Sequence, residues 1–125
     1  MANLRRINQE DLRNHNLSVT LDTLLRAQKP MSRADLAKET GLTKATLSLL
    51  ASMLIESGVV QEGEPVVSTT YGRPSTPLEI RGGSIAGIGL QINTDGYGCL
   101  ALDLNGDTLG REWVSEDMTG TDPYE

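Results

Sequence analysis

SRADLAKETGLTKATLSLLASMLIESGVV, residues 32–60, is the most informative segment of this chain. Its pattern predicts one helix over residues 32–40 and a second over residues 44–57, with Gly41 in the short link between them. Two helices joined by so short a turn are typical of a helix-turn-helix, whose second helix enters the major groove of DNA. The segment therefore predicts a DNA-reading element.

Capping residues and an apolar stripe support both helices. Ser32 and Thr43 each stand at a helix start as N-cap residues, and Asp35 forms a variant of the capping box with Ser32. Apolar residues in the second helix recur at a spacing of three and four, so one face of that helix is predicted to lie in a core. This stripe consists of Leu47, Leu50, Ala51, Leu54 and Ile55.

The flanking sequence completes the order of a winged helix. Upstream, residues 11–27 carry leucines at helical spacing, and Pro30 ends that predicted helix. Downstream, a short strand starts at residues 59–60, and two further extended segments, residues 66–70 and 78–80, bracket a loop. A helix, a helix-turn-helix and a two-stranded ribbon in this order predict a winged helix.

The loop of this ribbon carries an isolated cation. Arg73 lies between Gly72, which permits a tight turn, and Pro74, which stiffens the chain that follows. A narrow minor groove attracts an inserted arginine, so we expect Arg73 to contact the minor groove from the tip of the wing. The alternatives are a phosphate contact and an ordinary exposed arginine in a turn.

Further DNA contacts are expected where the helix-turn-helix would meet the duplex. Hydroxyl groups and a lysine reach phosphate oxygens and base edges there, and the positive end of the helix favours phosphate. A plain helical hairpin with a solvated face is the alternative. Leu49 and Met53 lie off the core stripe, and Leu49 fits a thymine methyl contact, a protomer contact or a wider core. The candidate residues are Arg33, Thr43, Lys44, Thr46 and Ser48.

The second half of the chain has a β pattern punctuated by glycine. The tetrapeptide LNGD, residues 104–107, predicts a two-residue hairpin between the last two strands. The predicted fold class is therefore α+β, with a winged helix-turn-helix domain over residues 1–81 and a short β-meander over residues 82–125. The predicted strands are residues 85–93, 97–103 and 108–114.

Composition excludes several classes of function. The 125 residues carry a net charge of −6, divided into +1 for residues 1–62 and −7 for residues 63–125, which argues against indiscriminate nucleic-acid binding. One cysteine and one histidine exclude a disulfide framework and a zinc site rich in these residues, so no cofactor or metal is expected. No apolar run approaches the ~20 residues of a membrane span, and the basic start lacks the apolar core of a secretory signal. We therefore expect a cytoplasmic protein without a membrane partner.

Acidic residues of the second half raise an enzymatic alternative. Asp95, Asp103 and Asp107 are close in sequence, and paired carboxylates bind metals or act as acid and base. Asp103 and Asp107 flank the predicted hairpin turn, where acidic residues are common for structural reasons. We therefore expect no catalytic residues.

Taken together, the motifs resemble those of ROK-family transcriptional repressors (repressor, open reading frame, kinase). The resemblance runs along nearly the whole chain, and the order of helix-turn-helix, GRP wing and DLNG hairpin is its specific part. It implies a winged helix followed by an actin-like, sugar-kinase-like domain, of which this chain holds the first three strands. The matching stretches are QEDLRNHNLSVTLDTLL (9–25), residues 32–60, YGRPSTPLEI (71–80) and IAGIGLQINTDGYGCLALDLNGDTL (85–109).

The resemblance also implies a function. It implies a sequence-specific repressor of sugar-utilisation genes that binds double-stranded DNA, with a sugar effector only where the rest of the effector domain is present. A module of this size makes few phosphate contacts, so we expect a homodimer on a two-fold symmetric site. Family members often carry Arg where this chain has Leu49, so one DNA contact of the family is missing here.

Two rival hypotheses come from other classes of protein. The first is a truncated sugar-kinase fragment, but the kinase branch holds ATP phosphates with an Asp and a Gly-Gly-Thr turn, whereas residues 91–95 read QINTD here. The second is a winged-helix module that binds protein and has lost DNA binding. A steep fall of DNA affinity with salt separates the second rival from a DNA-binding protein.

Overall fold

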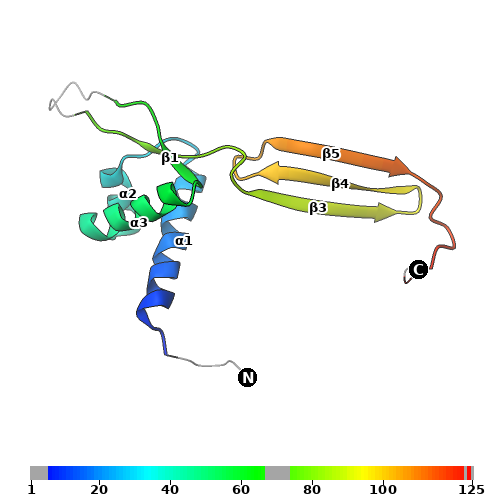
Figure 1. Cartoon of the computed structure of the whole chain (residues 1–125), viewed down its shortest axis with the longest axis horizontal. Helices are drawn as coiled ribbons and strands as arrows, with labels where there is room; N and C mark the ends of the chain where they lie inside the picture. The colour runs from blue at the N-terminus through cyan, green and yellow to red at the C-terminus, as the bar shows by residue number, and fades with distance from the viewer. Residues whose placement is uncertain (1–5, 67–73, 123, 125) are drawn as a thin grey trace. The chain divides into compact units, whose positions relative to one another are not determined.

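The computed structural model describes residues 6–66, 74–122 and 124. Contacts divide the chain into two compact units, Met1–Arg81 and Gly82–Glu125. The first unit contains three helices and a β-hairpin, and the second contains a three-stranded antiparallel sheet (Figure 1). The predicted α+β class, a winged helix-turn-helix followed by a meander, is confirmed.

The first helix, α1, spans Gln9–Ala27 and begins before the predicted start at Asp11. A reciprocal capping box explains the earlier start: Asn8 Oδ1 accepts the Asp11 N–H at 2.8 Å, and Asp11 Oδ2 accepts the Asn8 N–H at 3.2 Å. The helix ends because Gln28 adopts a left-handed φ of 52°. The chain has therefore left the helix before it reaches Pro30.

The helix-turn-helix consists of α2, Arg33–Thr40, and α3, Lys44–Glu56. Both predicted N-caps are confirmed, because the side chains of Ser32 and Thr43 each accept the N–H of the residue three positions further on. Gly41 has a φ of 76°, a left-handed value that favours glycine, and it turns the chain out of α2.

One hydrophobic core joins the three helices to the β-hairpin. The predicted stripe of α3 is confirmed, since four of its members are buried and Ile55 packs against the cluster. Full burial of a leucine side chain contributes about 1.5–3 kcal/mol, so these positions dominate the stability of the unit. The buried cluster comprises Leu24, Met31, Leu36, Ala37, Leu47, Ala51, Leu54, Val60 and Leu78.

The wing is an antiparallel hairpin of β1, Val60–Glu62, and β2, Leu78–Ile80. Its base is tied to the helix-turn-helix, because Met31, just before α2, exchanges two backbone hydrogen bonds with Leu78 at 2.9 and 2.7 Å. Leu78 is also only 1% exposed. The position of the wing is therefore fixed relative to the start of α2.

The hairpin extends beyond its named strands. Val66 and Ser75 exchange two backbone hydrogen bonds at 2.8 and 3.0 Å, so the two arms still pair at this level. The rest of the strand predicted over residues 66–70 lies outside the described residues, as does Arg73.

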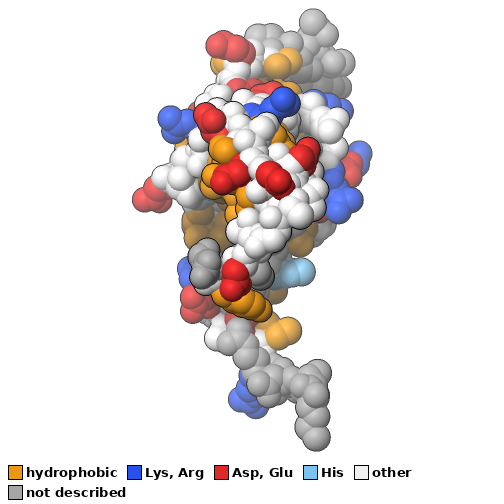
Figure 2. Space-filling view, turned by 90° about the vertical axis from the view of Figure 1, so that its right-hand side faces the viewer, with side chains coloured by type: hydrophobic (Ala, Val, Ile, Leu, Met, Phe, Trp, Pro, Cys, Tyr) orange, Lys and Arg blue, Asp and Glu red, His pale blue; other side chains and the backbone are white. Residues whose placement is uncertain are grey.

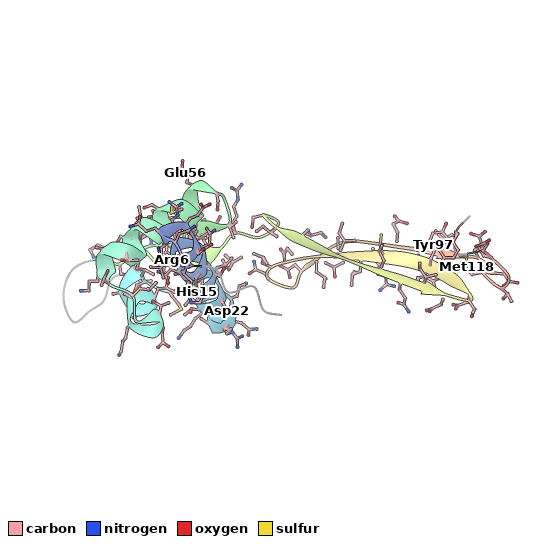
Figure 3. The ribbon with its side chains drawn as sticks, turned by 90° about the horizontal axis from the view of Figure 1, so that it is seen from below. Arg6, His15, Asp22, Glu56, Tyr97 and Met118 are labelled. Atoms are coloured by element: carbon pink, nitrogen blue, oxygen red, sulfur yellow. The ribbon has the colours of Figure 1, made fainter. Side chains whose placement is uncertain are left out.

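The second unit is a meander of β3, Ala86–Asn93, β4, Gly96–Asp103, and β5, Thr108–Ser115. Asn93 pairs with Gly96, so only two residues turn the chain between β3 and β4. After β5 the chain returns to this turn, where Met118 N–H donates to the Thr94 carbonyl at 2.9 Å. Tyr97 and Met118 accordingly lie at the same end of the sheet (Figure 3).

The two-residue hairpin predicted at LNGD is wrong. Four residues, 104–107, separate β4 from β5, and the pairing shifts register between Ala101 and Leu102. The side chain of Asp103 explains the longer turn, because its Oδ1 accepts the N–H groups of Asn105 and Asp107, both at 2.9 Å. The Gly106 N–H also donates to the Asp103 carbonyl at 3.1 Å, so a hydrogen-bonded turn centred on Leu104 and Asn105 replaces the predicted two-residue loop.

The sheet leaves apolar side chains of both outer strands uncovered. Every residue of β3 and β5 is exposed, whereas most of β4 is half-buried between them. Ile88, Leu90 and Ile92 share one face of β3 and are 72%, 78% and 74% exposed. The stability of the second unit therefore depends more on strand pairing than on a buried core.

A methyl group at Gly98 is expected to destabilise this sheet. A Cβ there would lie 2.5 Å from the Glu112 carbonyl oxygen and 2.6 Å from Trp113 Cε3, so β5 would have to move. We expect Gly98→Ala to lower the stability of the sheet by roughly 1–3 kcal/mol. Trp113 is the single tryptophan of the chain, so its fluorescence during urea denaturation reports this unit.

Gly89→Ala is the matched control for Gly98→Ala. A Cβ at Gly89 meets no described atom within 4 Å, and the loss of glycine's freedom in the unfolded chain favours folding by about 0.4–1 kcal/mol. Equal urea midpoints for the two variants would contradict the close packing of β4 against β5.

Candidate nucleic-acid interface

The outward face of α3 is the surface that a helix-turn-helix presents to DNA. Its exposed residues recur at a spacing of three and four and alternate with the buried stripe, so they form the opposite side of the helix. We call this surface the α3 outer face. It consists of Ala45, Ser48, Leu49 and Ser52.

The distribution of charged residues along α3 favours the binding of a polyanion. Lys44 is exposed at the first position of the helix, and the first turn holds no acidic residue. The helix carries no further charged residue until Glu56, its last, which lies exposed at the C-terminal end (Figure 3). The α3 outer face therefore brings no carboxylate towards a phosphate backbone.

The predicted hydroxyl contacts are not equivalent. Thr43 Oγ1 accepts the Thr46 N–H at 3.2 Å and donates to Thr46 Oγ1 at 2.9 Å, so both threonines are engaged in the cap. Thr46 is also half-buried. Ser48 is exposed, and its hydroxyl has no hydrogen-bond partner among the described residues. Ser48 is therefore better placed than Thr43 or Thr46 to donate to an external group.

Leu49 is a surface residue and not part of a wider core. Its exposed fraction is 61%, whereas the neighbouring stripe residues Leu47 and Leu50 are 0% and 2% exposed. Met53, one turn further along, is half-buried. The interpretation of Leu49 as part of a wider core is therefore wrong. A thymine methyl contact and a protomer contact stay open for this residue.

Arg33 is engaged within the protein. Its Nη2 lies 2.9 Å from Glu62 Oε1, so the start of α2 is linked to β1 of the wing. The two side chains are 34% and 52% exposed, and an ion pair so open to solvent contributes only about 0–1 kcal/mol. A guanidinium has five N–H donors, so Arg33 retains donors for a phosphate while it holds Glu62.

Only the base of the wing lies among the residues that the structure describes. The paired arms run from β1 and β2 to Val66 and Ser75, whereas Arg73 lies outside the described residues. On the face drawn in Figure 2, acidic and basic side chains are interspersed and not gathered by sign.

Sequence patterns missed two members of the α3 outer face, Ala45 and Ser52. The predicted contacts were polar groups at the N-terminal end of the helix, whereas Ala45 is apolar and Ser52 lies two turns further on. The buried stripe itself contained the signal, since residues midway between its members must point outward. Ser52 Oγ donates to the Ser48 carbonyl at 3.0 Å, which turns its hydroxyl hydrogen towards the helix backbone.

The carboxylate of Asp103 has a structural role in the second unit. The carboxylate of Asp103 accepts N–H groups from the loop after β4 and from Gly83, at 2.9 to 3.1 Å. The hydrogen bond from the Asp107 N–H is the main reason that the pKa of Asp103 is lowered.

Within the described part of the chain, no group of three or more His, Cys, Asp or Glu side chains is placed to hold a metal ion. No helix in that part has the length and apolarity of a membrane span.

Sequence comparisons find similarity to a helix-turn-helix domain and to transcriptional regulators. Residues 20–64 match the model of the IclR helix-turn-helix domain. The chain is 31% identical over 86 residues to the transcriptional regulators Mb0495 of Mycobacterium bovis and Rv0485 and MT0503 of Mycobacterium tuberculosis. The match covers 68% of this chain and 20% of each relative, so the chain spans about a fifth of their length.

A comparison of folds finds a similar arrangement in a larger protein. The crystal structure of a ROK family transcriptional regulator, described as a homologue of the E. coli MLC protein, superposes with a TM-score of 0.59 at 18% identity. The match covers 82% of this chain and 26% of that protein. At this identity the likeness concerns the fold, so the ROK resemblance has structural support while the sequence match is to an IclR-type helix-turn-helix.

Proposed function

We propose that the first unit binds double-stranded DNA in a sequence-specific manner and that the chain regulates transcription. The α3 outer face carries this proposal, because it is exposed, lacks carboxylates and begins at Lys44. In a helix-turn-helix this face enters the major groove, where Lys44 would contact phosphate and Ser48 a base edge or phosphate. The similarity to transcriptional regulators of Mycobacterium supports the same function.

The finer parts of the proposal concern the regulator as a whole. We propose a ROK-type repressor of sugar-utilisation genes that acts as a homodimer on a two-fold symmetric site. A sugar effector would require the rest of a ROK domain. Residues 1–81 would be the DNA-binding domain and residues 82–125 the start of the effector domain, with no enzymatic activity. Arg73 would add a minor-groove contact, and Arg33, Thr43 and Thr46 would add contacts at the ends of α2 and α3.

Selection of bound sequences from a random duplex library tests the proposal. We expect enrichment of a palindromic site with A·T-rich segments, and the same selection with Arg73→Ala tests the minor-groove contact at those segments. Failure to enrich any sequence at low salt would reject DNA reading. The winged-helix interaction module would then be favoured, because an exposed leucine at position 49 also suits a protein contact.

Lys44→Ala is expected to weaken binding evenly across sequences. The plot of log K against log salt concentration has a negative slope. Removal of one phosphate contact reduces the magnitude of this slope by about 1, because fewer counterions are released. Binding isotherms on the enriched duplex and on an unrelated duplex at several salt concentrations measure this slope. Lys38→Ala is the matched control, since Lys38 is an exposed lysine in the last turn of α2 and its loss removes the same charge. Equal slopes for the two variants would place Lys44 away from the phosphates.

A further inference from the structure

We propose that Leu49, with Ala45 beside it, reads the 5-methyl groups of thymine in the major groove. This inference rests on the proposed function, since it requires α3 to lie in the groove. It selects the thymine methyl contact from the alternatives that the sequence left open for Leu49, and it adds Ala45 to that contact. Two or more thymines at fixed positions of each half-site are the expected ligand.

Exposure is the first argument for this role. Leu49 is 61% exposed in a helix whose other leucines, Leu47, Leu50 and Leu54, are 9% exposed or less. Ala45 is exposed four residues earlier, which puts both side chains on the same side of the helix. Together they form a continuous apolar strip on a surface that would otherwise face water.

The arrangement of polar groups around the strip is the second argument. Ser48 and Ser52 flank Leu49, but the Ser52 hydroxyl hydrogen is directed to the Ser48 carbonyl at 3.0 Å. The side chains at the centre of the face, Ala45 and Leu49, have no donor for a guanine or adenine edge, and the hydroxyl of Ser48, which has no partner among the described residues, lies beside them. Thymine is the standard base that presents an apolar group in the major groove, so it is the base that suits this strip.

Dimensions agree with contact to more than one base. Residues four apart in a helix are separated by about 6 Å along the axis, and successive bases of a strand by about 3.4 Å. Ala45 and Leu49 thus span roughly two base steps. A protein partner is less well matched, because Lys44 at one end and the absence of carboxylates from residue 44 to residue 55 suit a polyanion.

Deoxyuridine substitution tests the inference, because it removes the 5-methyl group of thymine and nothing else. Each thymine of the enriched duplex is replaced in turn, and affinity is measured for the wild-type chain and for Leu49→Ala. We expect the wild type to lose about threefold to fivefold at one or two positions, the value of a buried methyl group. Leu49→Ala should bind the thymine duplex about as weakly as the wild type binds the deoxyuridine duplex. Its affinity should not fall further when deoxyuridine replaces thymine at one of these positions.

Two further variants identify the source of any change. Leu49→Met keeps an apolar side chain and should retain the preference for thymine. Leu12→Ala removes a leucine of α1 that is 54% exposed, outside the α3 outer face, and should leave the preference unchanged. Thermal unfolding of each variant confirms that the helices remain folded.

The outcomes separate this inference from the function on which it rests. If the wild type binds the enriched duplex but no deoxyuridine substitution matters, methyl reading is wrong and DNA binding stands. If Leu49→Ala loses affinity equally for both duplexes and keeps the methyl effect, Leu49 acts elsewhere, such as in a protomer contact. If the wild type enriches no duplex, both proposals are rejected.

Discussion

Leu47→Ala is expected to lower the free energy of unfolding of the first unit by roughly 2–5 kcal/mol, the range measured when a buried leucine is truncated to alanine. Leu47 is 0% exposed and belongs to the cluster that joins α3 to α1, α2 and the wing. Truncation removes packed atoms and leaves a cavity that the surrounding helices fill only in part. A small domain has a total stability of about 5–15 kcal/mol, so this change alone removes a large fraction of it.

Leu49→Ala is the control that the chain itself provides for Leu47→Ala. The two leucines are two positions apart in the same helix, but Leu49 is 61% exposed, so its truncation should change stability by less than about 0.5 kcal/mol. Circular dichroism of the helices during urea denaturation of the full chain measures both variants, because the described helices all lie in the first unit. A similar loss for the two variants would mean that Leu49 is packed against something in solution.

Ala45→Glu is expected to weaken DNA binding by on the order of 100-fold. The substitution places a carboxylate on the α3 outer face, where like-charge repulsion from a phosphate backbone costs several kcal/mol. A glutamate in the first turn of a helix also stabilises that helix by about 0.3–1 kcal/mol. The variant should therefore be at least as stable as the wild type while it loses affinity, so unfolding does not explain the loss.

Ala34→Glu is the matched control for Ala45→Glu. Ala34 is exposed at the second position of α2, as Ala45 is at the second position of α3, so net charge and helix position change in the same way. We expect its affinity to fall several times less in isotherms on the enriched duplex, because α2 contacts the backbone from outside the groove. A larger effect at Ala34 than at Ala45 would mean that α2, and not α3, is the helix closer to DNA.

The helices of the first unit were largely predictable from local patterns. The stripe from Leu47 to Ile55 and the caps at Ser32 and Thr43 specify α2 and α3, because both depend on residues within two turns of each other. The predicted start of α1 at Asp11 is wrong, because the capping box of Asn8 and Asp11 starts the helix at Gln9.

The wrong turn length between β4 and β5 and the engaged site residues have a different cause. LNGD resembles a two-residue hairpin, but the carboxylate of Asp103, just before it, accepts the N–H groups of Asn105 and Asp107 and so favours a longer turn. The ion pair of Arg33 and Glu62 joins residues 29 positions apart, and no local pattern reports such a distance. The hydroxyl bond between Thr43 and Thr46 likewise depends on rotamers that composition does not determine.

The sequence is compatible with an outward position of Leu49, but only the structure decides between that position and a buried one. A stripe at positions 47, 50, 51 and 54 places residue 49 on the opposite side, yet a leucine there is also compatible with a broad core. The 61% exposed fraction resolves this ambiguity in favour of a surface residue.

The pairing of Leu78 with Met31 has a consequence for synthesis of the chain on the ribosome. Leu78 fills the core and hydrogen-bonds to the residue that precedes α2, yet it is made long after the three helices. A nascent chain that has not yet released Leu78 from the exit tunnel contains the residues of α1, α2 and α3 but lacks one wall of its core. Because domains fold as units during translation, the first unit reaches its final structure only when β2 emerges. Competence to bind a target would thus be acquired late, in a single step, as the last strand closes the unit.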